Sequence, residues 1–421
     1  MAKILFCNPC DEFLAQKGDR APLGLGYLCS FVKSLGHEAR IFDLNHDKEE
    51  DMIKFAEEWK PDFACISVAT PNYNIAARLA IRLRQTLPNV KLVAGGNHIT
   101  AFPYEEKTLK LYDYAVMGDG ENGLAEILDG RAKTQVVFST DVNDIDVLPF
   151  PDYDELKFDR YFMKVNNKLG ATMVTSRGCV FSCYFCGSAK IKKWRPRSPE
   201  NVIQEMEILY HKWKREGFYF GDDIFTFNKP RVYQICKLMK ERLPPVTWRA
   251  TTRVDLVDKP LLEAMHDAGC DIISFGFESG NDRILKLIKK GPAATVARAR
   301  ETARLCKEIG IKVKGFFIIG HPGETWEDAM DTINLAKELQ LEYADFYPLT
   351  PYPSSPFWDY PDEYGIKIKT PIDSDWEGYF QVNQNTTDFD LKIEHPYLSH
   401  EQIKELLKLG REAISTGLTY K

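Results

Sequence analysis

The stretch Gly178-Cys179-Val180-Phe181-Ser182-Cys183-Tyr184-Phe185-Cys186-Gly187 decides the fold, because it places three thiols in a C-x-x-x-C-x-x-C pattern on one short loop. Thiolates are the usual ligands of iron–sulfur clusters, and a four-iron cluster takes four of them. Three cysteines on one loop would leave one iron without a protein ligand. An open metal position is typical of a catalytic site. The stretch therefore predicts a catalytic iron–sulfur centre.

Other uses of these cysteines fit the sequence less well. A zinc site could use Cys183 and Cys186 as one half, but no second pair of ligands follows nearby. A disulfide framework is not expected in a long chain that opens with MAKILF and shows no secretory signal. Ten cysteines without an export signal instead predict a reducing, cytoplasmic location.

Composition describes an ordinary globular chain. The 421 residues suffice for two or three domains, with 44% hydrophobic and 28% charged residues. No apolar run approaches the roughly 18 residues of a membrane span. The net charge of −6 makes nucleic acid an unexpected partner.

Over residues 1–140, short apolar runs alternate with helical segments five times, which predicts a doubly wound parallel sheet. Ligands of such sheets lie at the carboxyl ends of the strands, where this segment places Gly95-Gly96 and Gly118-Asp119-Gly120. Neither a dinucleotide motif nor a P-loop is present. Paired glycines suit the close approach of backbone to a large flat ligand.

A proline-rich linker is predicted over residues 141–170, and a second series of alternating strands and helices follows over 171–360. That series predicts a partial or complete parallel barrel with its active site at the carboxyl ends of the strands. Residues 361–421 contain Trp376, Tyr379, Phe380 and a helix over about 401–415. We expect them to form a cap that closes the site.

The cysteine stretch resembles the cluster motif of the radical S-adenosylmethionine (SAM) enzymes. Residues 1–140 are similar to the cobalamin-binding domain of the cobalamin-dependent branch of that family, at Pro22–Leu28, Gly95–His98 and Gly118–Glu121. The resemblance covers roughly residues 1–360. It implies an α/β chain with a Rossmann-like cobalamin-binding domain at 1–140, a linker, a partial TIM-type radical SAM barrel at 171–360, and a C-terminal cap.

One motif of many cobalamin proteins is absent. The D-x-H-x-x-G sequence supplies a histidine ligand to cobalt, whereas Asp43-Leu44-Asn45-His46 has a different spacing. No histidine of that motif can therefore hold cobalt from below, and His98 is the only histidine in a predicted ligand loop.

The resemblance assigns residues to three cofactors, which are a [4Fe–4S] cluster, SAM and cobalamin. For the cluster it names Cys179, Cys183 and Cys186. For SAM it names Phe185, Gly221, Asp222, Asp223, Arg253, Glu278 and Ser279, with Asp222 or Asp223 on the ammonium and Arg253 on the carboxylate. For cobalamin it names Asn8, Leu23, Gly24, Gly26, Thr70, Gly95, Gly96, Asn97, His98, Gly118, Gly120 and Glu121. Tyr347 and Tyr352 at the barrel rim are candidates for substrate contact.

The resemblance implies a class B radical SAM methyltransferase acting on an unactivated carbon. SAM would yield a 5′-deoxyadenosyl radical that takes a hydrogen atom from the substrate, and methylcobalamin would supply the methyl group. No general base is nominated. The electron donor would be a flavodoxin or ferredoxin, and the substrate a small molecule, peptide or protein. Compact members of this branch include the glutamine C-methyltransferase that acts on methyl-coenzyme M reductase, and the short cap fits such a substrate.

Three alternatives stay open. A radical SAM cyclase or rearrangement enzyme would use the same two domains. A methylthiotransferase would need a second cluster, for which Cys7, Cys10, Cys29 and Cys65 are available, but residues 361–421 do not resemble its usual RNA-binding barrel. An iron–sulfur or zinc sensor would need only the three cysteines. For Cys7 and Cys10, a structural role is favoured over a redox role, since no helix follows them.

Overall fold

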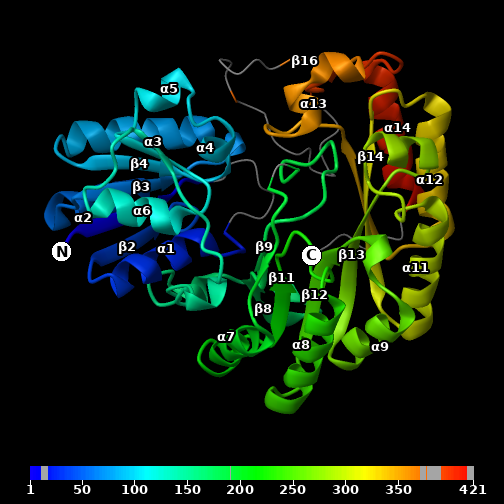
Figure 1. The fold of residues 1–421 in the computed structure, drawn as a ribbon, viewed down its shortest axis with the longest axis horizontal. Coiled ribbons are helices and arrows are strands. Elements are labelled where there is room, and N and C mark those ends of the chain that lie inside the picture. Colours follow the sequence, from blue (N-terminus) through cyan, green and yellow to red (C-terminus); the bar gives the residue numbers. More distant parts are fainter. Residues whose placement is uncertain (11–17, 190, 370–375, 377–389, 415–421) are drawn as a thin grey trace. The chain divides into compact units, whose positions relative to one another are not determined.

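The computed structural model describes residues 1–10, 18–189, 191–369, 376 and 390–414 of the chain. The chain divides into two compact units (Figure 1). The first unit comprises residues 1–163 together with 370–380, and the second comprises residues 164–369 together with 381–421. Each is built around one main β-sheet.

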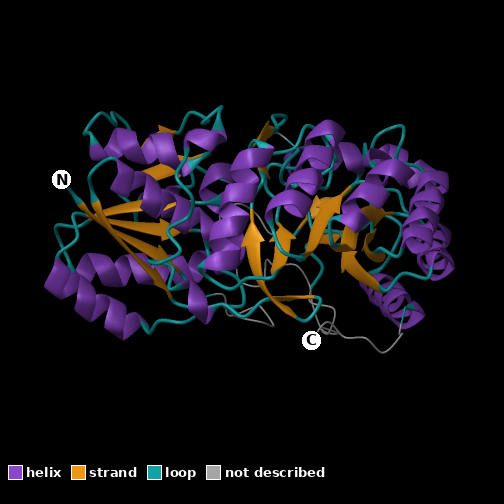
Figure 2. Cartoon of the chain, turned by 90° about the horizontal axis from the view of Figure 1, so that it is seen from below, coloured by secondary structure: helices purple, strands orange, loops and turns teal. Residues whose placement is uncertain are grey.

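The first unit contains a six-stranded, fully parallel sheet in the order β2-β1-β3-β4-β5-β6. Helices lie on both faces of this sheet (Figure 2). The strands are β1 (Lys3–Asn8), β2 (Glu38–Asp43), β3 (Phe63–Ser67), β4 (Lys91–Gly95), β5 (Tyr114–Met117) and β6 (Val136–Phe138). The helices are α1 (Leu23–Ser34), α2 (Glu49–Trp59), α3 (Tyr73–Thr86), α4 (Asn97–Ala101), α5 (Glu106–Leu109) and α6 (Gly120–Leu128), with the 3-10 turn η1 (Thr70–Asn72).

The strand order reverses between β1 and β3, so the carboxyl ends of these strands flank the topological switch point at which doubly wound sheets bind ligands. The central strands are buried on both faces, as their continuous apolar runs require. β6 is an addition to the five predicted strands, and its short Val136-Val137-Phe138 run is its only signal in the sequence.

The segment 141–170, expected to be a linker, has ordered structure. It contains the 3-10 turns η2 (Ile145–Val147) and η3 (Phe158–Arg160). Within the first unit, Lys33 Nζ lies 2.8 Å from a carboxylate oxygen of Asp152, and the Tyr161 hydroxyl donates to buried Asp43. Its last residues form β7 (Lys164–Val165) and the start of β8 (Lys168–Met173) in the second unit.

The second unit contains a seven-stranded sheet in the order β15-β14-β13-β12-β11-β8-β7, parallel from β8 to β15. Only β7 runs antiparallel. In Figure 1, α8, α9, α11 and α12 lie along the outside of this curved sheet. The remaining strands are β11 (Gly217–Phe220), β12 (Thr247–Thr252), β13 (Cys270–Glu278), β14 (Lys312–Ile319) and β15 (Tyr343–Pro348), with two short ribbons, β9 (Ser176–Arg177) with β10 (Arg195–Pro196) and β16 (Lys367–Ile368) with β17 (Ile393–Glu394).

The helices of the second unit begin where the sequence places capping residues. Ser198 accepts from the backbone N–H of Asn201 at the start of α7, with proline at the first helical position, and Thr325 forms a capping box with Asp328 at the start of α12. The helices are α7 (Pro199–His211), α8 (Lys229–Arg242), α9 (Lys259–Asp267), α10 (Asp282–Leu287), α11 (Val296–Ile309), α12 (Trp326–Leu339), α13 (Pro356–Asp359) and α14 (His400–Ala413), with 3-10 turns η4 (Val254–Leu256) and η5 (Pro361–Tyr364).

The predicted fold class, a doubly wound domain followed by a partial barrel, is confirmed. Of the C-terminal residues named from the sequence, Trp376 belongs to the first unit, while Tyr379 and Phe380 lie outside the described residues. Among the described helices, none is both long and apolar enough to cross a bilayer.

Candidate active site

The three cysteines lie on a loop at the carboxyl end of β8, after the short strand β9. The Cys186 N–H donates to the carbonyl of Cys183 at 3.0 Å, which closes a tight turn between the last two thiols. Gly178 opens the loop with φ +84°, and a side chain there would meet the carbonyl oxygen of Lys193 at 2.2 Å. Only glycine combines this dihedral angle with this close approach.

Backbone hydrogen bonds on both sides of Tyr184 fix the loop to the barrel. The Tyr184 N–H donates to the carbonyl of Ile288, and the Tyr184 carbonyl accepts from the N–H of Phe357. The Tyr184 ring packs edge-on against Phe357 and Tyr364. The middle of the motif is thus held before any cofactor binds, which favours a preformed site.

The chemistry of the three thiols fits an iron–sulfur cluster. All three are free, Cys183 is buried, and the other two are partly buried. Burial and the neighbouring thiols raise the pKa of Cys186 to about 11, so cluster binding must displace a proton. The thiols do not converge on one point as they would around a single ion. Cys179, Cys183 and Cys186 would hold a four-iron cluster, which would be left one ligand short and so open to SAM.

The structure distinguishes between the two aspartates after β11. Asp222 is buried and accepts three hydrogen bonds at 2.6 Å, from the N–H and hydroxyl of Thr175 and the hydroxyl of Ser176. It therefore fixes the segment that leads into the cysteine loop. Asp223 keeps an exposed carboxylate, although loss of surrounding solvent and the charge of Asp222 raise its pKa. Of the pair, Asp223 is the better candidate to bind the SAM ammonium group, together with the carbonyl of Gly221.

Replacing Asp223 by asparagine is expected to weaken SAM binding about tenfold or more, because a hydrogen bond to a charged group contributes about 1.5–3 kcal/mol. The thermal stability of the Asp223→Asn variant should stay close to that of the wild type. Asp222→Asn is the matched control, which should instead lower stability by about 1–3 kcal/mol, since one oxygen that now accepts becomes a donor. Equilibrium SAM binding and thermal unfolding of both variants check this, and equal SAM affinity in wild type and Asp223→Asn would contradict it.

Arg253, assigned from the sequence to the SAM carboxylate, is held at the cysteine loop by other contacts. Its Nε and Nη2 each lie 2.9 Å from an oxygen of Asp255, and Nη1 lies 3.6 Å from the Cys183 sulfur. The guanidinium carbon lies 3.9 Å from the centre of the Phe181 ring. This arrangement places a fixed positive charge beside one cluster ligand, and pairing with SAM remains a prediction.

Glu278, at the end of β13, forms a buried ion pair with Lys290 at 2.6 Å. Its φ of +66° lies in the left-handed region, which is strained for a residue that carries a side chain. Gly276 makes room for the pair, because a side chain there would meet the Glu278 carboxylate at 2.2 Å. The Lys290 ammonium lies 5.7 Å from the centre of the Phe185 ring. The Ser279 hydroxyl lies 3.2 Å from the Thr332 hydroxyl of α12, and its contact with SAM stays a prediction.

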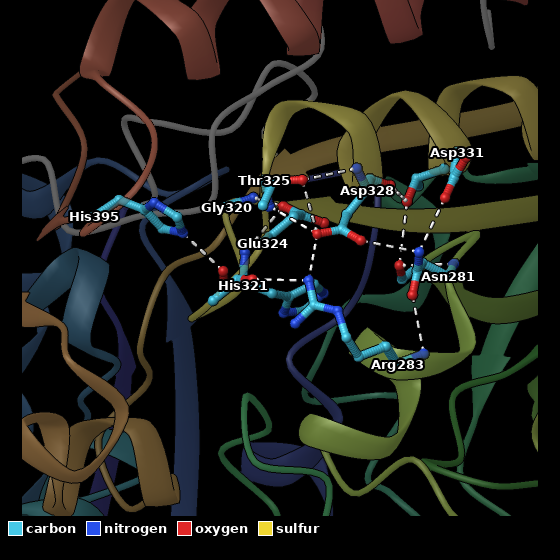
Figure 3. Close-up of polar contacts among 12 residues, drawn as sticks. Asn281, Arg283, Gly320, His321, Glu324, Thr325, Asp328, Asp331 and His395 are labelled. Carbon is cyan, nitrogen blue, oxygen red and sulfur yellow. Dashed lines mark hydrogen bonds and ion pairs between the residues drawn. The ribbon is translucent and has the colours of Figure 1, made fainter.

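The loop after β14 brings His321 close to Phe185, with the two ring centres 6.1 Å apart. The His321 side chain is fully buried, and burial with the nearby His395 lowers its pKa to about 3, so the ring is neutral. His395 donates from Nε2 to the His321 carbonyl at 2.7 Å (Figure 3). Glu324 accepts from the backbone N–H groups of Gly320 and His321, which fixes the turn.

A polar network supports this turn from the side of α12 (Figure 3). Asp328 forms the capping box with Thr325 and accepts from the Asn281 amide at 3.0 Å. Arg283 donates to Asp328 and to the carbonyl of Gly323. The network joins the loop after β13 to the loop after β14, two neighbouring strand ends of the proposed SAM site.

The stability of the second unit is expected to depend on pH through Glu324. Burial raises the pKa of Glu324 to about 8, although its two backbone donors lower it. A pKa above the unfolded value of about 4.5 means that the folded chain binds the additional proton, so this stabilisation is full below pH 4.5 and is lost as the pH rises to 8. Wild-type stability should fall by up to about 1.4 kcal/mol per pH unit in this window.

Glu324→Gln should remove this slope, because the amide keeps an acceptor for the two N–H groups and cannot ionise. Urea unfolding of both proteins between pH 5 and 8 measures the difference. The variant should gain stability relative to the wild type as the pH rises, and a difference independent of pH would show that Glu324 is ionised throughout.

The two rim tyrosines lie near the cysteine loop to different extents. The Tyr347 hydroxyl donates to Asp345 at 2.9 Å. Tyr352 lies beside the loop, since a side chain added at Gly187 would meet its Cβ at 3.6 Å. Burial and the nearby Cys186 raise the pKa of Tyr352 to about 12, so its phenol stays protonated and can donate.

In the first unit, the predicted cobalamin residues gather at the carboxyl edge of the sheet. Asn8 ends β1, Thr70 follows β3, Gly95 ends β4, and Gly118 and Gly120 follow β5. Gly96 has φ +107° and approaches Val68 so closely that a side chain would lie 2.7 Å from its carbonyl oxygen. Asn97 and His98 open α4, and Leu23 and Gly24 open α1.

The glycines of this edge serve different purposes. A side chain at Gly24 or Gly95 would meet no atom within 4 Å, so both face open space that a ligand can use. Gly26 instead allows Leu156 to pack, and Gly120 allows Leu28 to pack. Glu121 is buried in α6. The open glycines fit a bulky flat ligand such as cobalamin, whereas the packing roles of Gly26 and Gly120 need no ligand.

His98 lies inside the first unit and is not directed into open space. Its imidazole is fully buried, Nδ1 lies 3.2 Å from the Thr70 hydroxyl, and Nε2 lies 3.3 Å from Glu105. Both ring nitrogens therefore have partners within the protein. A direct bond from His98 to cobalt would require both contacts to rearrange.

The open space at Gly95 leads to a size-dependent prediction. Gly95→Ala should bind cobalamin nearly as well as the wild type, while Gly95→Leu should bind roughly five- to 150-fold more weakly, because forcing extra methylenes into filled space costs about 1–3 kcal/mol. Neither should unfold the chain, since no atom lies near the added Cβ. Spectrophotometric cobalamin titration and thermal unfolding test this, and equal affinity for both variants would place the ligand elsewhere.

Several residues of these sites were missed from the sequence. Lys290 and Glu105 come from loop or short-helix positions without a motif, and their partners become neighbours only in the fold. His321 and Glu324 follow β14 and belong to none of the motifs identified from the sequence. The spacing of Glu324 after Gly320, which lets its carboxylate reach back to the turn, was the available signal.

The N-terminal cysteines do not form a second cluster loop. Cys7 and Cys65 lie on adjacent strands and Cys29 on α1, all within the core, and burial raises the pKa of Cys7 to about 12. The three are spread over separate elements. The arrangement favours structural thiols and disfavours a methylthiotransferase.

An open parallel barrel with three thiols at the carboxyl ends of its strands is the arrangement expected of a radical SAM enzyme. Residues 173–336 match the radical SAM superfamily, and residues 14–128 match the B12-binding domain. A protein named an uncharacterized methyltransferase of Pyrococcus horikoshii is 33% identical, over 92% of this chain and 86% of its own. The anaerobic magnesium-protoporphyrin IX monomethyl ester cyclase of Cereibacter sphaeroides is 27% identical, over 81% of this chain and 60% of its own.

Among solved structures, the radical SAM methyltransferase TsrM of Kitasatospora setae, with cobalamin and a [4Fe–4S] cluster bound, has a similar fold. The TM-score is 0.73 at 17% identity, with 88% of this chain and 78% of that chain covered. The chain belongs to the cobalamin-dependent radical SAM methyltransferases. Its cofactors are a [4Fe–4S] cluster, SAM and cobalamin.

Proposed function

We propose that this methyltransferase acts on an unactivated sp3 carbon, and that its substrate is a glutamine side chain in a peptide or protein. When bound, the reduced cluster and SAM supply a radical that takes a hydrogen atom, and cobalamin supplies the methyl group. The role of the chain is to bind, orient and exclude water. An external donor of the flavodoxin or ferredoxin type would deliver the electron.

The observation that supports an sp3 carbon is the state of the ionisable groups near the cysteine loop. Asp222 accepts three hydrogen bonds, and Arg253 is paired with Asp255. Glu278 is paired with Lys290. His321 is neutral, with a pKa of about 3, too low for an effective base near neutral pH. These groups suit the loss of a hydrogen atom from carbon, which needs no base.

The substrate is argued from the barrel rim. An amide side chain both donates and accepts hydrogen bonds. Tyr352 carries a protonated phenol beside the cysteine loop, and Tyr347 pairs with the carboxylate of Asp345. A glutamine carbonyl could accept from Tyr352, and its NH2 group could donate to the oxygens near Tyr347. This pairing is the basis for proposing a primary amide in preference to an apolar substrate.

The test combines cofactor counts with a labelled substrate. After anaerobic purification with cobalamin supplied, we expect about four iron atoms and one cobalamin per chain. With SAM carrying a labelled methyl group and glutamine peptides deuterated on the side chain, mass spectrometry should find one labelled methyl per peptide and deuterium in 5′-deoxyadenosine. Methylation without deuterium transfer would contradict the sp3 carbon, and labelling of no glutamine peptide would contradict the substrate.

A cyclase is the second candidate, because one relative carries that name at 27% identity over 81% of this chain. The same labelled assay separates the two activities. A cyclase would form a new ring and transfer no methyl group from SAM to the product, so the product mass alone decides. Supplying a tetrapyrrole ester alongside the peptides tests both in one experiment.

A further inference from the structure

Trp376 comes from the C-terminal third of the sequence but belongs to the first unit. Its side chain is 1% exposed. The indole stacks on Phe102 with ring centres 5.1 Å apart and an angle of 26°, and it meets the edge of His98 at 5.2 Å. The Lys107 ammonium lies 5.4 Å from the indole centre. A buried tryptophan with three such neighbours occupies a defined position.

The indole is also part of a hydrogen-bond chain. Its Nε1–H donates to Oε1 of Glu105 at 3.0 Å, while Thr108 and His98 lie against Oε2 of the same carboxylate. Burial raises the pKa of Glu105, but the donors from His98, Thr108 and Trp376 outweigh it and hold the pKa at about 2. Glu105 is therefore an acceptor only.

The Glu105 carboxylate determines which atom donates in each hydrogen bond of this network. Because Glu105 can only accept, His98 carries a proton on Nε2. The other nitrogen of the ring, Nδ1, lies 3.2 Å from the Thr70 hydroxyl, and in the tautomer with its proton on Nε2 it accepts from that hydroxyl. The Thr70 oxygen can then use its lone pairs to accept a hydrogen bond from a bound ligand. Thr70 follows β3 at the switch point, where the ligand of a doubly wound sheet lies.

We propose that Trp376, Glu105 and His98 are positioning residues that orient the Thr70 hydroxyl as an acceptor for an N–H group of cobalamin. The periphery of the corrin ring carries primary amides, which supply such donors. The proposal rests on cobalamin binding by this chain and deepens it, because it assigns Trp376 a role in holding the cofactor. None of the three residues needs to touch cobalamin.

A double-mutant cycle on the full chain tests the proposal, with the cobalamin dissociation constant as readout. Trp376→Phe keeps the aromatic ring and removes the N–H, and Thr70→Val removes the hydroxyl. Each should weaken cobalamin binding roughly tenfold, as removal of outer-shell partners commonly does. In the Thr70→Val background, Trp376→Phe should add less than about twofold, because residues that act through one another are not additive. Thr70→Ser should retain wild-type affinity.

The matched control is Trp59→Phe, at the end of α2 in the same unit, which should bind cobalamin like the wild type. Independent, multiplicative effects of Trp376→Phe and Thr70→Val would show that Trp376 acts only through general stability and would overturn the proposal. So would wild-type affinity in Trp376→Phe. If that variant does not fold, Glu105→Gln takes its place in the cycle. A wild-type chain without cobalamin affinity would instead refute the cobalamin assignment itself.

Discussion

Replacing Cys183 by alanine is expected to abolish the iron–sulfur cluster and all radical chemistry. The loop supplies three thiols, and a cluster left with two protein ligands would lose most of its attachment. The anaerobically reconstituted variant should contain almost no iron or sulfide and should lack the visible absorption and the reduced-state electron paramagnetic resonance signal of the wild type.

Cys236 offers a matched control, since it is also a buried, free cysteine of the second unit but lies on α8, away from the loop. Cys236→Ala should keep the full iron content. Cobalamin binding should survive in Cys183→Ala, because the predicted cobalamin residues are in the first unit. A Cys183→Ala chain that still held four iron atoms would contradict the prediction, because it would mean that other residues hold the cluster.

The buried pair of Glu278 and Lys290 carries the second large prediction. Both side chains are less than 10% exposed and their charged atoms are 2.6 Å apart. Lys290→Met removes one partner and leaves an uncompensated carboxylate in the interior, which should cost about 3–5 kcal/mol of stability. Glu278→Gln should have a similar effect by leaving the ammonium group unpaired.

The double variant Glu278→Gln/Lys290→Met should recover most of that loss, because no buried charge is left unpaired. Chemical unfolding of the four proteins gives the coupling energy. The pair Arg300–Glu338, with both side chains about half exposed, is the control, and breaking it should cost at most about 1 kcal/mol. Additive losses at Glu278 and Lys290 would indicate that solvent reaches the pair.

The elements that could be predicted are those whose signal is local in sequence. Buried parallel strands such as β3 and β5 appear as continuous apolar runs, and Ser198-Pro199 marks the start of α7. The cysteine loop was predicted because its chemistry depends only on residue type and spacing. The short β6 was missed, since three residues carry too little periodicity to separate a strand from a loop.

The sequence predicted where the site residues lie better than it predicted what each of them contacts. Strand ends are readable, so Asp222, Arg253 and Glu278 were placed correctly at the carboxyl ends. Their partners come from other elements, and a partner decides whether a carboxylate is open to a ligand. Asp222 turned inward to Thr175 and Ser176, and Glu278 paired with Lys290, for reasons that only three-dimensional neighbours supply.

Trp376 makes the first unit discontinuous in sequence, and this affects its synthesis. The N-terminal part of that unit ends at residue 163, and its last described contact arrives with residue 376, which is 376 − 163 = 213 residues later. At a translation rate of about 5–20 residues per second, this separation corresponds to roughly 10 to 40 s. During that time Glu105 and His98 lack the indole that covers them, so the growing chain carries an unfinished cobalamin domain until residue 376 has been synthesised.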